Sequence, residues 1–153
     1  MDYRDFIESK KHRQQFYGVE VSDSQIHSKL YPFQRDIVRW ACHRGRAAIF
    51  LDTGLGKTFI QLEWCRLLGE CSLIIAPLSV TRQTIREAKK IGIEVRYIRS
   101  MADVSDDCGI YTCNYEMVGA IDFLRFGAVV LDESSILKSL SGVTRRYLTE
   151  RCA

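Results

Sequence analysis

The feature that most constrains the fold is a glycine-containing turn between an apolar run and a helical pattern. Residues 52–58 are Asp-Thr-Gly-Leu-Gly-Lys-Thr, and the apolar run 47–51 comes directly before them. A compact apolar run of this kind is typical of a strand buried on both faces of a parallel sheet. A helical pattern of apolar residues follows the turn and ends at Gly69. The sequence therefore predicts a strand, a loop and a helix in direct succession.

The chemistry of this loop favours binding of a nucleotide phosphate. Gly54 and Gly56 allow backbone N–H groups to turn toward phosphate oxygens, and the helix N-terminus behind them adds partial positive charge. Lys57 can reach the β- and γ-phosphates, and the Thr58 hydroxyl can bind Mg²⁺. We therefore expect ATP and Mg²⁺ as cofactors; a glycine turn with an exposed lysine is the structural alternative. The loop residues expected to bind them are Asp52, Thr53, Gly54, Leu55, Gly56, Lys57 and Thr58.

A second acidic motif lies 75 residues after Lys57 (132 minus 57), where the apolar run 128–131 ends in Asp132 and Glu133. Asp132 is suited to hold Mg²⁺ through water, and Glu133 to polarise the attacking water as general base. Both strand tips would then meet one ion, so we expect this strand beside the one at 47–51. Taken alone, the motif also fits a helix cap or a solvated turn. The catalytic candidates are thus Lys57, Asp132 and Glu133, and the metal candidates are Thr58 and Asp132.

Strand and helix patterns alternate along most of the chain, which predicts an α/β fold with a parallel sheet and helices on both faces. Residues 1–27 are interpreted as an N-terminal helical extension, with a polar surface helix in 1–15, and residues 28–153 as the main lobe. Further strands are expected at 73–76, 94–98, 110–112 and 128–131, and further helices at 33–41, 79–91, 115–123 and 142–152.

Composition narrows the function without defining it. The chain has 153 residues, which suits one domain, and a net charge of +3, which permits contact with nucleic acid without requiring it. No signal peptide or membrane-spanning apolar run is present in the sequence, so no membrane partner is expected. The six cysteines form no Cys-x-x-Cys pair, which favours reduced, mostly buried thiols in the cytoplasm. A metal site at Cys108 and Cys113 is a weak alternative because their spacing is loose.

Beyond these motifs, the chain resembles the first RecA-like lobe of superfamily 2 helicases, most closely the Swi/Snf-type translocases, over about residues 28–150. The matching segments are Leu30-Tyr31-Pro32-Phe33-Gln34, Gly54-Leu55-Gly56-Lys57-Thr58, Ile75-Ala76-Pro77-Leu78-Ser79, Asn114-Tyr115-Glu116, Asp132-Glu133 and Lys138. The resemblance implies a RecA-like P-loop NTPase fold in which Gln34 reads the adenine edge. It also implies that the segments around Ser79 and Asn114 face DNA, and bacterial and phage relatives match better than chromatin remodellers.

DNA contact is expected to be independent of base sequence. No residue suggests readout of base edges, whereas N–H groups at the start of the 79–91 helix suit a DNA phosphate. Ser79 is also a plausible N-cap there, and ordinary capping or turn roles remain open for the polar candidates. We expect weak binding of duplex DNA by the chain alone. The candidate contacts are Ser79, Thr81, Arg82, Thr112 and Asn114.

The sequence also departs from the family pattern. Ser134 and Ser135 replace a Gly/Ala-His pair that helps to couple ATP and DNA in the family. The family's Thr-Ala-Thr-Pro-like strand end is expected after the 142–152 helix, and the second lobe with its arginine finger lies outside this sequence. The resulting hypothesis is the ATP-binding lobe of a DNA-dependent ATPase or helicase, incomplete at its C-terminal end and inactive as a motor without its second lobe. The alternatives are an ATP- or DNA-binding module without turnover and another P-loop NTPase, such as a kinase.

Overall fold

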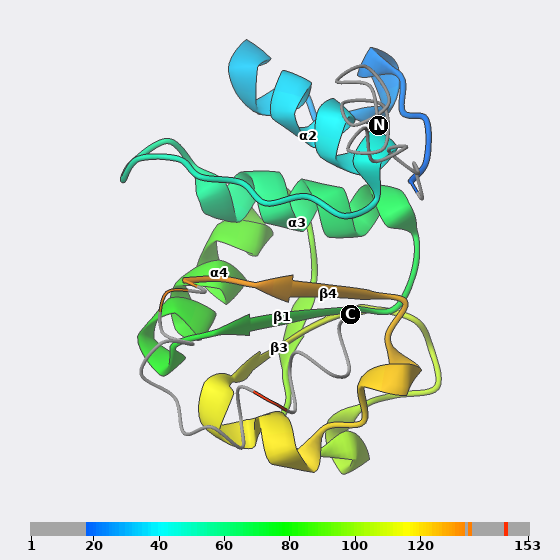
Figure 1. The fold of residues 1–153 in the computed structure, drawn as a ribbon, viewed down its shortest axis with the longest axis vertical. Helices are drawn as coiled ribbons and strands as arrows, with labels where there is room; N and C mark the ends of the chain where they lie inside the picture. Colours follow the sequence, from blue (N-terminus) through cyan, green and yellow to red (C-terminus); the bar gives the residue numbers. More distant parts are fainter. Residues whose placement is uncertain (1–17, 134, 136–145, 147–153) are drawn as a thin grey trace, which may run out of the picture.

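The computed structural model describes residues 18–133, 135 and 146. Within these residues the sheet has the order β2-β3-β1-β4, and every pairing is parallel (Figure 1). The strands are β1 Ser72–Ala76, β2 Val95–Tyr97, β3 Ile110–Asn114 and β4 Ala128–Leu131. The α-helices are α2 Pro32–Arg44, α3 Lys57–Leu68 and α4 Leu78–Lys90, and the 3₁₀ segments are η1 Asp23–Gln25, η2 Met101–Asp103, η3 Tyr115–Ala120 and η4 Phe123–Arg125.

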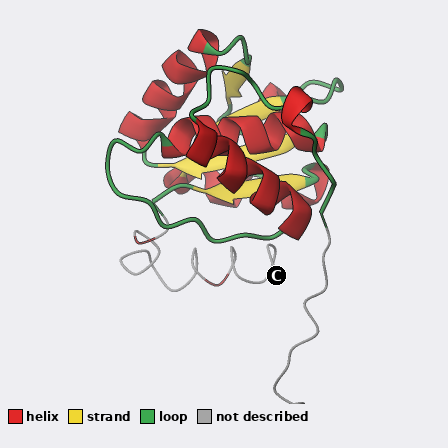
Figure 2. Cartoon of the chain, turned by 90° about the horizontal axis from the view of Figure 1, so that it is seen from above, coloured by secondary structure: helices red, strands yellow, loops and turns green. Residues whose placement is uncertain are grey.

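The sheet is the middle layer of the domain, as the view from above in Figure 2 also shows. Helices α3 and α4 cover one face, where Leu62 and Ala88 pack with Ile74 of β1. The opposite face is covered by η3 and η4, whose side chains pack with Leu73 and Ile75. Helix α2 lies outside α3 and contributes to a third apolar cluster with it (Figure 1). The predicted α/β class with a parallel sheet is confirmed.

The strands predicted at 73–76, 94–98, 110–112 and 128–131 are confirmed as β1, β2, β3 and β4. All residues of β1 and β3 are buried, as expected for central parallel strands that are covered on both faces. Strand β4 is an edge strand in the described residues, and only Ala128 at its start is buried. No helix among the residues described here is long and apolar enough to cross a membrane.

Glycines end two helices as the sequence predicts. Gly45 and Gly69 follow α2 and α3 with φ of 72° and 67°, values at which a side chain would be strained. The predicted N-cap at Ser79 is wrong, because α4 begins at Leu78 with Pro77 as its N-cap. Ser79 thus lies within the first turn of the helix, and no side chain caps it.

The predicted strand at 47–51 is wrong in the described structure: this segment is neither helix nor strand. Ile49 and Leu51 pack partly against the α2–α3 cluster, whereas the Phe50 side chain is 89 % exposed. A strand requires a neighbour to share its backbone hydrogen bonds, and the described sheet pairs β4 with β1 alone. The 47–51 segment is apolar but has no partner strand in the described sheet.

Two other expectations differ from the structure or fall outside it. The short helix predicted at 115–123 is formed by the 3₁₀ segments η3 and η4, which leave Asp122 between them as an N-cap. Of the predicted N-terminal extension, residues 18–27 are described and contain one 3₁₀ turn, η1. The helices predicted at 1–15 and 142–152 lie outside the described residues, apart from Arg146, which is helical.

Candidate functional site

The glycine-containing loop connects the 47–51 segment to α3 in the conformation that its sequence suggests. Gly54 and Gly56 have φ of 87° and 74°, in the left-handed region that favours glycine. Gly56 is the N-cap of α3, and a Cβ atom on it would collide with the side-chain amide of Gln34. The loop therefore has a local reason for both glycines. Residues 52–55 are exposed, so a ligand can approach their backbone N–H groups.

Lys57 folds back over the loop that precedes it. Its Nζ atom donates to the carbonyl oxygen of Leu51 at 2.8 Å and to that of Asp52 at 3.3 Å. Thr58 follows in the first turn of α3 and is half-buried. The ammonium group is thus held at the mouth of the loop by neutral acceptors, which an anionic phosphate would outcompete.

The two acidic candidates lie at the carboxyl end of β4. The Asp132 N–H donates to the Ile75 carbonyl at 2.8 Å, which continues the pairing with β1. One Asp132 carboxylate oxygen accepts from the Glu133 N–H at 2.9 Å, and the other from Gln61 Nε2 at 3.0 Å. Glu133 has a φ of 51°, the one non-glycine residue in the left-handed region among those described. This costly conformation is maintained by the surrounding contacts.

Sequence reasoning missed two residues that fix Asp132. Gln61 lies four positions after Lys57 on the same face of α3, so helical spacing could have indicated it. The Tyr115 hydroxyl donates to the Asp132 carbonyl at 2.7 Å, a contact that no sequence signal predicts. Burial raises the pKa of Tyr115, and the neighbouring carboxylates of Asp132 and Glu133 raise it further, so the hydroxyl stays a donor.

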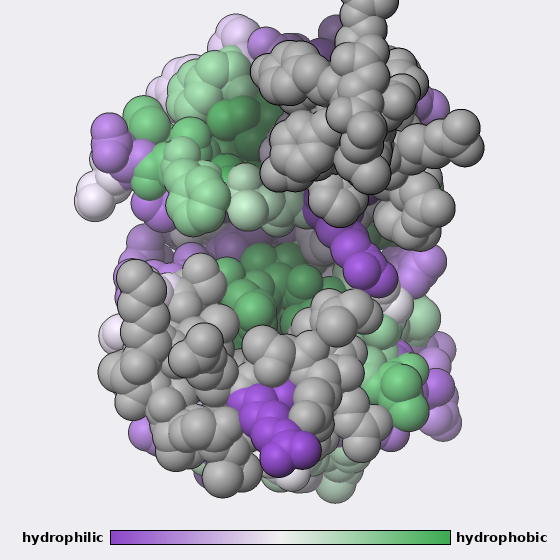
Figure 3. All heavy atoms as spheres, in the orientation of Figure 1, coloured by the Kyte–Doolittle hydropathy of each residue, from purple (hydrophilic) through white to green (hydrophobic). Residues whose placement is uncertain are grey.

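A groove of about 1200 Å³ lies between the 47–51 segment and β4. Lys57, Asp132 and Glu133 all line it, so the structure brings the three catalytic candidates to one cavity. Figure 3 shows a hydrophobic hollow on this side of the molecule. The expected direct pairing of β4 with a strand at 47–51 is wrong, because the groove separates them.

A smaller pocket of about 350 Å³ lies on the other side of the loop, between the start of α2 and the end of α4. Gln34, which lines this pocket, is 4 % exposed and connects the start of α2 to the loop. Its Oε1 accepts from the Tyr31 N–H at 2.9 Å, and its Nε2 donates to the Leu55 carbonyl at 3.0 Å. One amide hydrogen and one lone pair remain for a ligand. The structure thus places Gln34 against the loop; its reading of adenine stays a prediction.

The DNA candidates divide into exposed and buried residues. Ser79 and Arg82 are exposed on α4. The buried hydroxyls of Thr81 and Thr112 instead donate to the carbonyl oxygens of Leu78 and Ile74 at 2.7 and 2.9 Å. The buried Asn114 accepts from Tyr97 and donates to Glu116. The polar groups of Thr81, Thr112 and Asn114 are thus satisfied inside the domain, and contact of these residues with DNA stays a prediction.

Cysteine positions agree with the sequence interpretation for the described residues. Cys42, Cys65, Cys71 and Cys113 are buried free thiols, and Cys108 is an exposed one. Cys113 is therefore inside the domain, whereas Cys108, its partner in the alternative metal site, lies on the surface. Among the described residues, no group of three His, Cys, Asp or Glu side chains could hold a metal ion.

The parallel sheet, its covering helices and the loop at the start of α3 define a RecA-like α/β domain. The structure resembles the Sulfolobus solfataricus SWI2/SNF2 ATPase core in complex with dsDNA, with a TM-score of 0.68 and 19 % identity, over 86 % of this chain and 32 % of that one. It also resembles the UvsW helicase from bacteriophage T4, with a TM-score of 0.65 and 18 % identity, over 99 % of this chain and 56 % of that one.

Sequence comparison gives the family. The chain is 31 % identical over 148 residues to the Xenopus tropicalis SWI/SNF-related matrix-associated actin-dependent regulator of chromatin subfamily A-like protein 1. It is 27 % identical over 154 residues to the Bos taurus DNA annealing helicase and endonuclease ZRANB3. These alignments cover 84 % and 85 % of this chain but 15 % and 14 % of those proteins. No family model matches. The chain corresponds to the first RecA-like lobe of SWI/SNF-related helicase-like proteins.

Proposed function

We propose that this chain binds ATP with Mg²⁺ as the nucleotide-binding lobe of a DNA-dependent ATPase. The observation that carries the proposal is the shared groove, in which Lys57 of the loop and the acidic pair Asp132 and Glu133 line one cavity. A cationic loop at a helix N-terminus suits the phosphates, and a carboxylate on a neighbouring strand suits their metal ion.

The donor set fits Mg²⁺, which takes few protein ligands and completes its shell with water and phosphate oxygens. The Thr58 hydroxyl and the Asp132 carboxylate are the groups that would hold it. When bound, the ion would neutralise charge that develops on the phosphates during hydrolysis. Gln61 already orients the Asp132 carboxylate from α3, and Glu133 would accept a proton from the attacking water.

The proposal extends to weak, sequence-independent contact with duplex DNA. One solved relative is described as a complex with dsDNA. Ser79 and Arg82 are exposed at the start of α4, and the exposed Arg86 follows one turn later. This arrangement offers positive charge and helix N-terminal N–H groups to a phosphate backbone without reading base edges.

Turnover would depend on a second RecA-like lobe. An arginine finger raises the rate of phosphoryl transfer by roughly 10³ to 10⁵ where it has been measured, and its natural position is on a facing lobe. A facing lobe would also exclude water from the groove that Lys57 and Glu133 line. We expect this chain alone to bind Mg-ATP and to hydrolyse it barely above the uncatalysed rate.

The test is a titration of the 153-residue protein with Mg-ATP, with inorganic tripolyphosphate as a second ligand. Both should bind saturably because the loop is expected to bind phosphate groups, and ATP should bind more tightly because it also has a base. Phosphate release is then measured at saturating ATP with and without duplex DNA, with Glu133→Gln as the control for contaminating ATPase. Failure of both ligands to bind would refute the proposal.

A further inference from the structure

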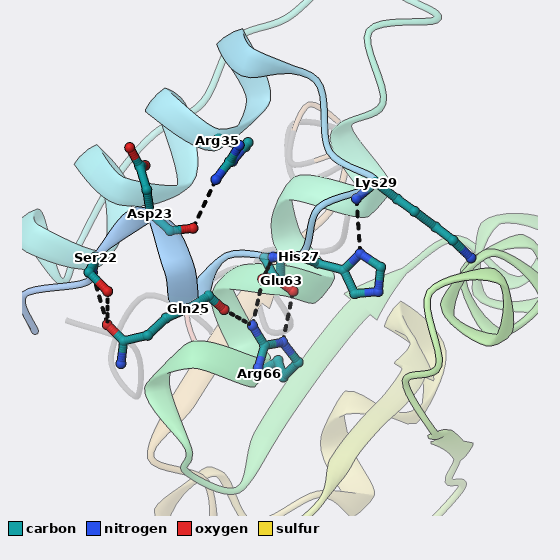
Figure 4. A network of polar contacts seen from close by, with 8 residues as sticks. All are labelled: Ser22, Asp23, Gln25, His27, Lys29, Arg35, Glu63 and Arg66. Atoms are coloured by element: carbon teal, nitrogen blue, oxygen red, sulfur yellow. Dashed lines mark hydrogen bonds and ion pairs between the residues drawn. The ribbon is translucent and has the colours of Figure 1, made fainter.

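An ion pair between the buried Glu63 and the exposed Arg66 connects two turns of α3 in a part of the domain that the proposed chemistry does not use (Figure 4). The Glu63 side chain is fully buried, and its carboxylate accepts from Arg66 Nη2 at 2.6 Å and from Arg66 Nε at 2.8 Å. Burial by itself would raise the pKa of Glu63, but the hydrogen bonds from Arg66 and from the His27 N–H lower it, so the group is ionised.

Both partners of the pair also hold a distant segment of the chain. Glu63 Oε1 accepts from the backbone N–H of His27 at 2.7 Å. Arg66 Nη2 donates to the backbone carbonyl of Gln25 at 2.5 Å (Figure 4). Residues 25–27 are thus attached to α3 by one acceptor and one donor, neither of which the helix needs for itself.

From His27 the contacts continue toward the nucleotide loop. The Leu30 N–H donates to the His27 carbonyl at 3.1 Å, and the Lys29 N–H donates to His27 Nδ1 at 3.1 Å. Lys29 Nζ reaches the Lys90 carbonyl at the end of α4 at 2.7 Å. These bonds fix the turn that leads into Tyr31, whose N–H is bound by Gln34.

This turn forms one wall of the pocket of about 350 Å³ beside the loop, because Lys29, Leu30, Tyr31 and Gln34 line the pocket together with Gly54 and Gly56. The Leu55 carbonyl is joined to the same wall through Gln34. The pocket therefore lies between the turn at residues 29–31, which follows the segment bound by the ion pair, and the loop that leads into α3.

We propose that Glu63 and Arg66 are positioning residues that fix the base side of the nucleotide site, so that the purine base of a nucleoside triphosphate is selected in the pocket beside Gln34. The inference rests on the proposed nucleotide binding. It assigns the pair to base selection and leaves phosphate binding to the loop.

The pair is tested by a double substitution, Glu63→Leu with Arg66→Met, which removes both charges together and leaves no buried charge unpaired. Dissociation constants are measured for Mg-ATP, Mg-GTP and inorganic tripolyphosphate on the 153-residue protein. We expect the ATP affinity to fall about tenfold toward that of GTP, which corresponds to about 1.4 kcal/mol. The tripolyphosphate affinity should change less than about twofold, because the proposal leaves phosphate binding to the loop.

A matched control and a milder variant make the outcome decisive. Glu94→Leu with Arg96→Met removes an exposed pair from the β2 edge, and it should leave the affinities for all three ligands unchanged. Arg66→Lys keeps the positive charge but loses the fork that binds Glu63 and Gln25 together, so it should give a smaller fall in ATP affinity if the double variant does not fold.

Three results would overturn the inference. An equal fall for ATP and tripolyphosphate would show that the pair acts on the whole domain. Unchanged ATP and GTP affinities in a folded double variant, or in Arg66→Lys, would show that it has no part in base selection. A parent protein that binds neither ATP nor tripolyphosphate would refute the proposed function itself, and the inference with it.

Discussion

Replacement of Lys57 by alanine should separate ligand binding from folding. The Lys57 ammonium group makes two hydrogen bonds to the loop carbonyls of Leu51 and Asp52, and the residue is half-buried. Loss of these solvated bonds should cost about 1 kcal/mol of folding free energy. With ATP bound, two charge-assisted bonds to phosphate oxygens would contribute roughly 3–6 kcal/mol, from which the loop bonds given up must be subtracted. A net loss of about 2–5 kcal/mol corresponds to a roughly 30- to 5000-fold weaker affinity.

Isothermal titration with Mg-ATP and urea unfolding measure the two quantities on the same protein. Lys89→Ala is the matched control, because it removes the same charge from an exposed position on α4. We expect a large change in affinity with a small change in stability for Lys57→Ala, and neither for the control. Equal ATP affinity of Lys57→Ala and the parent would refute the assignment of the loop to phosphate.

The remaining predictions concern the base pocket, the acidic turn, the thiols and DNA. Gln34→Glu keeps an acceptor for the Tyr31 N–H but places an oxygen against the Leu55 carbonyl, so the preference for ATP over GTP should narrow and stability should fall by about 1–3 kcal/mol; an unchanged preference in competition assays removes Gln34 from the base site. Tyr115→Phe deletes only the hydroxyl that binds the Asp132 carbonyl, so urea unfolding should show a loss of about 1–2 kcal/mol and ATP binding should depend less on Mg²⁺, whereas a variant identical to the parent would contradict the role of this contact. Burial raises the pKa of Cys42 to about 11, which keeps its thiol protonated at pH 8, so mass-spectrometric mapping should find Cys108 alkylated well before Cys42; equal rates would show that α2 opens readily. Arg82→Ala with Arg86→Ala should weaken duplex binding for every sequence tested and reduce its salt dependence, and tight, sequence-selective binding by the parent would contradict backbone contact.

The sequence was sufficient to predict strands that pair with a neighbouring strand in the described sheet. Strand β1 is apolar throughout and pairs on both sides, so its composition predicts its burial. The 47–51 segment has a similar composition, yet it is not a strand, and Phe50 is almost fully exposed. An apolar run indicates that a segment can be buried in a sheet, but only a neighbouring strand supplies the hydrogen bonds that make it one.

The polar residues of the site show a different limit of sequence reasoning. Thr112 was a candidate hydrogen-bond donor to DNA, but its hydroxyl donates to the carbonyl of Ile74, 38 residues away in the chain. Asp132 was found from its motif, whereas its partners Gln61 and Tyr115 are 71 and 17 residues away in the chain. Motifs report residues with a fixed local spacing, and contacts between elements depend on the packing of helices and strands.

The two halves of the candidate site differ in how firmly the protein holds them. Asp132 is fixed by β1 through Ile75, by α3 through Gln61 and by the Tyr115 hydroxyl. The loop at 52–55 is exposed, and its own backbone contact, from the Leu55 N–H to the Asp52 carbonyl, is 3.4 Å long. An arriving phosphate would therefore order the loop against acids that are already in place. Substitutions of the non-glycine loop residues should then change affinity with little effect on stability, whereas substitutions around Asp132 should change both, because the same contacts support the fold and the proposed metal ligand.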